Sequence, residues 1–144
     1  MHMNTAEIIE FLRSKEASKR CLGLKLAGRQ LEYAALPLAS RALVADNDPE
    51  VRALAAWTLD QLGSPVTVPA LIEALYDPDF NVRSNAGWAL VHMAERMIPQ
   101  VVVPDVVDVM RDRNSSNARQ MAYLVLNHIG NESARDAIRR YWHG

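Results

Sequence analysis

Side chains that could do chemistry are sparse in this sequence. Its histidines are His2, His92, His128 and His143, and its one cysteine is Cys21. A metal site needs three or four such ligands close together, but His92 and His128 share their register with no Asp or Glu. Cys21 has no base nearby in the sequence, which predicts an unreactive thiol, and no G-x-S-x-G or glycine-rich phosphate loop is present. We therefore expect no catalytic residue, no metal and no cofactor.

Composition and charge narrow the classes of protein further. The chain has 144 residues, with 16 Lys and Arg against 17 Asp and Glu, so it lacks the basic surplus that nucleic acids and anionic membranes attract. The longest apolar stretches, 66–71 and 101–107, contain proline and fall short of the ~18 residues of a membrane span. One cysteine and no signal-peptide pattern favour a cytoplasmic protein. Residues 1–4 are expected to form a tail, and Met1-His2 before Met3 can be interpreted as a cloning remnant.

The chain repeats itself, and this periodicity is the strongest signal in it. Residues 46–63 match residues 77–94 at an offset of 31, including the Val-Arg pair and the tryptophan of each segment. Weaker copies begin near residues 14 and 112. A second apolar pattern precedes each copy, starting at Ala6, Pro37, Pro69 and Pro104. The unit is thus a pair of short segments seen four times, which is typical of repeat proteins.

Both segments of the unit have helical periodicity. In the third unit, Pro69 suits the first position of a helix, and residues 77–79 (Asp-Pro-Asp) separate it from the next helix. Thr5 is expected to cap the first helix, and residues 132–142 to form a last helix that closes the open end. The second helix of the third unit spaces its apolar residues along one face, which predicts a buried stripe. That stripe consists of Val82, Ala86, Ala89, Leu90 and Met93.

The repeated pattern D-x-D-x-x-V-R-x-x-A-A-x-x-L-x-x-L-G, preceded by P-A-L-I-E-A-L, resembles the HEAT-repeat family. More narrowly, it is similar to the short repeats, about 31 residues long, of phycocyanobilin lyase subunits and many small prokaryotic proteins. The resemblance implies an all-α, right-handed α-solenoid of about four HEAT-like helical hairpins plus a C-terminal capping helix. The expected units are 5–30, 36–63, 66–97 and 99–130, followed by the cap at 132–142, in one domain over 5–142. The same fold serves scaffolds, lyase subunits and a few enzymes, so it does not fix the function.

The resemblance also implies where a partner would bind, because the second helices of HEAT repeats line the concave face. Trp57 and Trp88 share a register opposite the buried stripe, and a large apolar side chain on a free face often marks an interaction surface. The alternative is that both tryptophans are wedged between repeats. Leu22 and Lys25 are expected to lie at the N-terminal end of this row of concave-face residues. The candidate partner-binding residues are Trp57, Trp88, Phe80, Asn81, Asn85, Leu54, Gln61, His92, Met121, Leu124 and His128.

An arginine recurs at the start of each second helix. Phosphate binding is one interpretation, but ion pairs with aspartates of adjacent turns fit better in a chain without excess positive charge. The arginines are Arg20, Arg52, Arg83 and Arg119, and the candidate partners are Asp46, Asp48, Asp77 and Asp79. A basic cluster near the C-terminus is expected to be a solvated helix surface, with a docking patch as the alternative. It comprises Arg111, Arg113, Arg135, Arg139 and Arg140.

These patterns favour a non-catalytic protein-binding module or scaffold, whose preformed concave groove accepts a peptide, a helix or a folded domain. A preformed groove loses little conformational entropy on binding. Two alternatives come from other classes. The first is a bilin lyase subunit or phycobilisome-associated chaperone, in which the groove contacts a tetrapyrrole (a bilin) or a phycobiliprotein. The second is a HEAT protein of the DNA-lesion glycosylase kind, which the net charge of −1 and the short chain disfavour.

Overall fold

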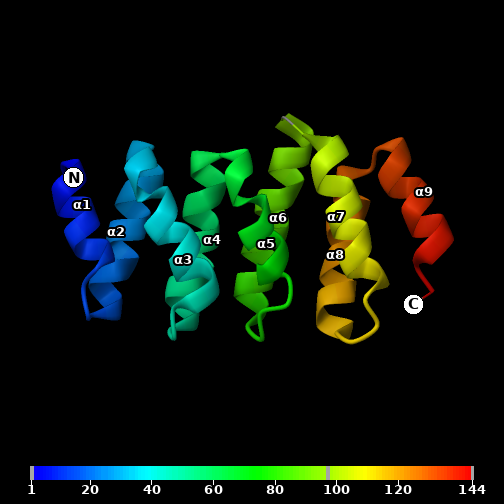
Figure 1. The fold of residues 1–144 in the computed structure, drawn as a ribbon, viewed down its shortest axis with the longest axis horizontal. Coiled ribbons are helices and arrows are strands. Elements are labelled where there is room, and N and C mark those ends of the chain that lie inside the picture. The colour runs from blue at the N-terminus through cyan, green and yellow to red at the C-terminus, as the bar shows by residue number, and fades with distance from the viewer. Residues whose placement is uncertain (1, 97, 144) are drawn as a thin grey trace.

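A computed structural model describes residues 2–96 and 98–143, and helices account for most of them (Figure 1). No β-strand occurs within these residues. Two short 3-10 helices, η1 (Tyr33–Ala35) and η2 (Pro65–Thr67), lead into the third and fifth α-helices. Met1, part of the possible cloning remnant, lies outside the described residues. The α-helices are α1 (Thr5–Leu12), α2 (Ala17–Gln30), α3 (Leu36–Ala45), α4 (Pro49–Leu62), α5 (Val68–Ala74), α6 (Phe80–Arg96), α7 (Pro99–Arg111), α8 (Ser116–Ile129) and α9 (Glu132–Tyr141).

The helices pack in sequential pairs that stack into an α-solenoid. α1 contacts α2, α3 contacts α4, α5 contacts α6, and α7 contacts α8. The second helices of the pairs also contact one another in the order α2, α4, α6, α8, while α9 packs on α7 and α8. The termini therefore lie at opposite ends of the stack (Figure 1). The predicted all-α solenoid is confirmed, and we propose the four pairs as its repeating units with α9 as the cap.

The predicted apolar stripe of α6 forms part of the core. Val82, Ala86, Ala89 and Leu90 are fully buried, and Met93 is 2% exposed. The alanine side chains are small, so neighbouring helices can approach α6 closely on this side. The stripe predicted from sequence is therefore confirmed.

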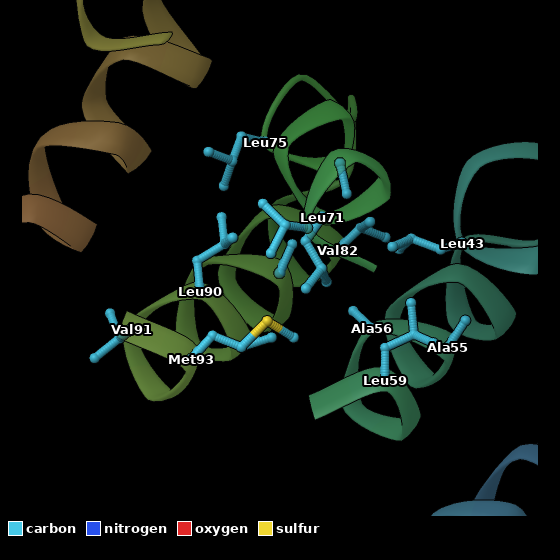
Figure 2. Packing of buried hydrophobic residues seen from close by; sticks show 14 of the residues in the cluster. Leu43, Ala55, Ala56, Leu59, Leu71, Leu75, Val82, Leu90, Val91 and Met93 are labelled. Carbon is cyan, nitrogen blue, oxygen red and sulfur yellow. The ribbon is translucent and has the colours of Figure 1, made fainter. Parts of the chain in front are cut away.

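The partners of this stripe come from α5 and from the preceding pair of helices. Leu71 of α5, Leu75 directly after it and Leu43 of α3 are fully buried beside it (Figure 2). Burying a leucine contributes about 1.5–3 kcal/mol. Much of this burial crosses from one pair of helices to the next, which is how repeat arrays gain their stability.

The N-terminal residues are tied to the first pair of helices. The prediction that Thr5 caps α1 is wrong, because the Asn4 side chain accepts a hydrogen bond from the Glu7 amide (2.9 Å) and the Glu7 carboxylate accepts one from the Asn4 amide (3.4 Å). Such a capping box needs an acidic residue three positions after the cap, and only Asn4 has one. Met3 is 8% exposed and its backbone exchanges two hydrogen bonds with the Gln30 side chain (2.8 and 2.9 Å).

Three of the second helices end in a left-handed residue. Gly63 after α4 has φ 66° and Gly130 after α8 has φ 61°, as expected for glycine caps. After α2 the same position is held by Leu31, with φ 53°. A side chain with a Cβ is strained there, so α2 ends less favourably than α4 and α8.

Candidate functional site

An apolar hollow lies between α6 and α8, on the side of the second helices that faces away from their partners in each pair. We call the outward side of α2, α4, α6 and α8 the second-helix face, and this depression of about 120 Å³ the α6–α8 hollow. Phe80, Trp88 and Leu124 are exposed around it, by 60%, 45% and 46%. It is lined by Phe80, Ser84, Gly87, Trp88, Val91, Met121, Leu124, Val125 and His128.

Gly87 lets α8 approach α6 at the base of this hollow. A Cβ built at Gly87 would lie 3.1 Å from Cγ2 of Val125 and 3.3 Å from Sδ of Met121. Met121 itself is only 7% exposed, so it packs between the helices. The close packing of α6 against α8 therefore forms the base of the hollow.

Two histidines flank the Trp88 ring. The His128 ring lies 4.7 Å from it and the His92 ring 5.9 Å, the latter stacked at 28°. His92 Nδ1 in turn lies 2.9 Å from Oδ2 of Asp60, whose side chain is 11% exposed. Asp60 could not be found by comparing matching positions, because it comes one residue before Gln61, which matches His92 at the offset of 31.

Trp57 has different surroundings from Trp88 although the two share a register. It is half-buried, and its ring covers Gly28 of α2 so closely that a Cβ there would lie 2.6 Å from Trp57 Cζ3. In the next repeat the position of Gly28 is held by Asp60. The Trp88 ring therefore cannot pack over a glycine as Trp57 does, and it lies exposed beside α8.

The other candidate residues fall into two groups. Asn85 and Leu54 lie with Trp57 in a wider depression of about 290 Å³ beside α2. The Asn85 amide is already engaged, since its Nδ2 donates to the Ala53 carbonyl at 2.9 Å. Asn81 and Gln61 are exposed but line neither depression. The structure thus gathers Phe80, Trp88, Met121, Leu124 and His128 in the α6–α8 hollow, with His92 against Trp88.

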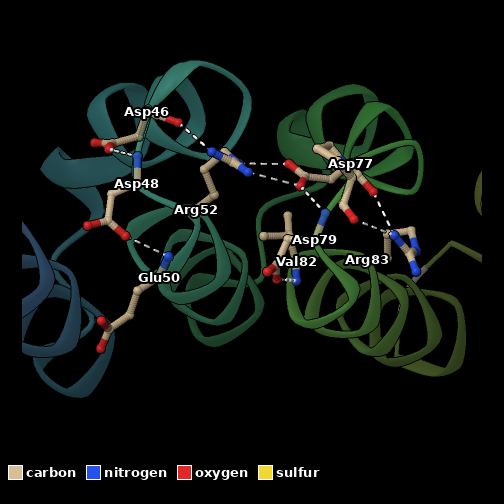
Figure 3. Close-up of polar contacts among 9 residues, drawn as sticks. Asp46, Asp48, Glu50, Arg52, Asp77, Asp79, Val82 and Arg83 are labelled. Carbon is tan, nitrogen blue, oxygen red and sulfur yellow. Dashed lines mark hydrogen bonds and ion pairs between the residues drawn. The ribbon is translucent and has the colours of Figure 1, made fainter.

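We call the arginines that recur at the start of each second helix the arginine ladder. Two of them form the expected ion pairs between repeats. Arg20 Nε donates to Asp46 at 2.9 Å. Arg52 Nε donates to Asp77 at 2.8 Å (Figure 3). These hydrogen bonds raise the pKa of both guanidinium groups. Asp48 is a candidate partner of these arginines, but its side chain accepts a hydrogen bond from the Glu50 amide at the start of α4. Asp79 likewise accepts from the Val82 amide at the start of α6 (Figure 3).

The ladder changes at its C-terminal half, where the predicted arginine–aspartate pairs are wrong. Arg83 Nη1 donates to the backbone carbonyl of Asp77, and its Nε is buried without a hydrogen-bond partner among the described residues. Asp112, which makes the same turn as Asp77, accepts instead from the Tyr76 hydroxyl at 2.8 Å. Partial burial and this hydrogen bond raise the pKa of Tyr76 to about 12. Arg119 Nε donates to the Met110 carbonyl.

The basic cluster near the C-terminus is largely engaged with its own neighbourhood. The Arg111 guanidinium lies 4.1 Å from the centre of the Tyr141 ring. Arg139 and Arg140 both pair with Asp136, at 3.4 and 3.2 Å. Arg135 donates to the Gly130 carbonyl, and Arg113 is exposed. The cluster is thus an exposed helix surface with local contacts, in which Asp136 pairs with two of the five arginines.

Cys21 shows no catalytic surroundings. The thiol is half-buried, and burial raises its pKa, with further upward contributions from Glu50 and Asp48. A raised pKa lowers the fraction of reactive thiolate. Over residues 2–96 and 98–143, no group of three or more His, Cys, Asp or Glu side chains could hold a metal ion. In the same part of the chain, no helix has the length and apolar character needed to cross a membrane.

The chain belongs to the HEAT-repeat family, whose model matches residues 5–91 and 68–143. Its structure is similar to the crystal structure of an engineered protein from the Northeast Structural Genomics Consortium. That likeness has a TM-score of 0.64 and 18% sequence identity, and covers 96% of this chain and 68% of that chain. At such identity the likeness concerns the fold alone. None of the curated proteins matches the sequence, and the narrower resemblance to phycocyanobilin lyase subunits is not confirmed by these matches.

Proposed function

We propose that the chain is a non-catalytic protein-binding module, and that a partner protein docks on its second-helix face with an apolar side chain in the α6–α8 hollow. The observation that carries this proposal is the exposure of Phe80, Trp88 and Leu124, by 60%, 45% and 46%, around one hollow. Aromatic side chains beside a pocket are typical anchors of protein interfaces, because they bury a large area at a small cost in rotamer freedom. The helices hold these side chains in place before a partner arrives.

The size of the hollow supports a protein partner over a bilin. Pockets for small molecules and cofactors have volumes of roughly 300–1,000 Å³, whereas the α6–α8 hollow measures about 120 Å³. That space suits one side chain and is small for a tetrapyrrole. A depression of about 500 Å³ on α1 and the start of α2 is larger, but Glu10, Arg13 and Lys19 contribute charged groups to its lining.

The charge of the chain supports a protein partner over a nucleic acid. The net charge is −1, and near the C-terminus Arg139 and Arg140 both pair with Asp136. Binding to nucleic acid depends on unpaired cations that neutralise phosphates. We also propose a cytoplasmic location, as the single half-buried cysteine suits a reducing compartment.

The proposal can be tested by selecting random displayed peptides on the full chain and measuring the affinity of the selected peptides for variants. We expect Trp88→Ala to weaken binding about 30-fold or more, while Tyr33→Ala has no effect. Tyr33 is a matched control because it is an aromatic residue with 54% exposure in the turn between α2 and α3. If no peptide is selected, or if the selected peptides bind the Trp88 variant as well as the wild type, the proposal is wrong.

A further inference from the structure

The second-helix face is positively charged at its N-terminal end. Lys25 and Arg29 of α2 are both exposed, and they line the wider depression together with Leu54 and Trp57. None of the ion pairs among the described residues includes either of these two cations. Their charges are therefore available to a partner that lies across Trp57.

The two acidic residues of α4 that could oppose these cations are Glu50 and Asp60. Glu50 comes seven residues before Trp57 on α4, so it lies about two helical turns, or roughly 10 Å, from the row of Lys25 and Trp57. The Asp60 carboxylate is 11% exposed and already pairs with His92. Among the described residues, neither carboxylate forms an ion pair with Lys25 or Arg29.

The other end of the face is apolar. The α6–α8 hollow has no Asp, Glu, Lys or Arg in its lining, and its rim is formed by Phe80, Trp88 and Leu124. A partner that covers both ends must therefore carry negative charge at one end and a large apolar side chain at the other.

The distance between the two ends sets the spacing of these features in a partner. Neighbouring helices pack about 8–10 Å apart, and the path from α2 to the gap between α6 and α8 crosses two and a half such intervals, about 20–25 Å. An extended chain covers about 3.3–3.6 Å per residue. An extended segment would therefore place the two features about six or seven residues apart.

We propose that the partner segment is an extended acidic peptide that places one or two Asp or Glu side chains against Lys25 and Arg29, and a large apolar side chain in the α6–α8 hollow. The segment runs across α4 and α6 and covers Trp57 on the way. This inference rests on the function proposed above and specifies the chemistry of the partner.

The test uses a fluorescein-labelled consensus peptide from the display selection and an analogue with every Asp and Glu replaced by its amide. We expect the acidic peptide to bind the wild type about 3- to 10-fold more tightly than the analogue, as two partly exposed ion pairs would give. The double variant K25E/R29E should abolish that preference. The matched control K15E/R41E reverses two exposed cations that line neither depression and should keep it.

The outcomes separate this inference from the proposed function. If the amide analogue binds as well as the acidic peptide while Trp88→Ala still weakens binding, the acidic chemistry is wrong and the function stands. If Trp88→Ala has no effect on either peptide, both are wrong. If a single-stranded oligonucleotide binds at low salt in a Trp88-dependent manner and competes with the peptide, the choice of an acidic peptide is overturned.

Discussion

The ring of Trp57 lies directly on the backbone of Gly28, so that a Cβ on Gly28 would come within 2.6 Å of Cζ3 of the indole. This contact joins α2 to α4 and half-buries the tryptophan. One repeat later, Asp60 replaces the glycine and binds His92, so Trp88 cannot pack in the same way and is 45% exposed. The presence or absence of a glycine beneath the ring thus separates a half-buried tryptophan from an exposed one.

Gly28→Ala is expected to destabilise the protein. Alanine favours a helix over glycine by about 0.5–1 kcal/mol, but overpacking against the Trp57 ring costs about 1–3 kcal/mol. We expect a net loss of about 1 kcal/mol in the free energy of unfolding, measured by urea denaturation. Combining the change with Trp57→Leu should remove the clash, which a double-mutant cycle would detect. A Gly28→Ala variant that is more stable than the wild type would disprove the contact.

Arg52→Ala is expected to cost stability without affecting the binding of a partner peptide. The guanidinium donates to Asp77, whose side chain is 9% exposed, and to the Asp46 carbonyl at 2.9 Å. Removing it leaves a largely buried carboxylate unpaired, at a cost of about 1–3 kcal/mol. Denaturation of the variant beside Arg41→Ala, an exposed arginine on α3, measures this cost. Equal stability of the two variants would show that the ion pair between the repeats contributes nothing.

Leu31→Gly is expected to stabilise the protein. Leu31 has φ 53° and is 51% exposed, so glycine would relieve backbone strain of about 1–2 kcal/mol while losing little packing. The greater freedom of glycine in the unfolded chain offsets part of this gain, which leaves about 0.5–1 kcal/mol. Leu31→Ala keeps the strain and serves as the control. The prediction fails if the glycine variant unfolds at lower denaturant than the alanine variant.

The Tyr76–Asp112 hydrogen bond predicts a loss of stability at high pH. The pKa of Tyr76 is raised to about 12 in the folded protein by burial first and the contact with Asp112 second, whereas an unfolded tyrosine has a pKa near 10. Because the folded pKa is the higher one, the contribution is complete below about pH 10 and disappears as the pH rises towards 12.

Tyrosinate absorbance during a pH titration, with Tyr76→Phe as the reference, reports this pKa. Asp112→Asn removes the charged acceptor and should lower the pKa of Tyr76 while leaving the effect of burial. An unchanged Tyr76 titration in the Asp112 variant would show that the carboxylate does not hold the hydroxyl.

The helix pairs and their core could be predicted from the sequence because repetition and helical periodicity act within single segments. The stripe from Val82 to Met93 and the shared register of Trp57 and Trp88 are of this kind. The difference between the two tryptophans could not be predicted in the same way, since it depends on which residue the preceding repeat places beneath each ring. Comparing residues three positions further along in the preceding repeat would have found Gly28 and Asp60.

The arginine ladder shows the same limit. Each arginine lies at the same place in its repeat, which predicts the same ion pair four times. Tyr76 competes for the carboxylate of Asp112, so Arg83 turns to backbone carbonyls instead. Competition between side chains of different repeats cannot be read from one repeat alone.

We propose that Trp88 belongs to a binding surface and not to the core. The most direct test measures, for Trp88→Ala, both the affinity of the selected peptide and the free energy of unfolding. We expect the affinity to fall by about 30-fold or more, as for an interface anchor worth about 2 kcal/mol, and the stability to fall by less than about 1 kcal/mol. Unchanged affinity, or a loss of about 3–5 kcal/mol in stability as for a buried tryptophan, would contradict the claim.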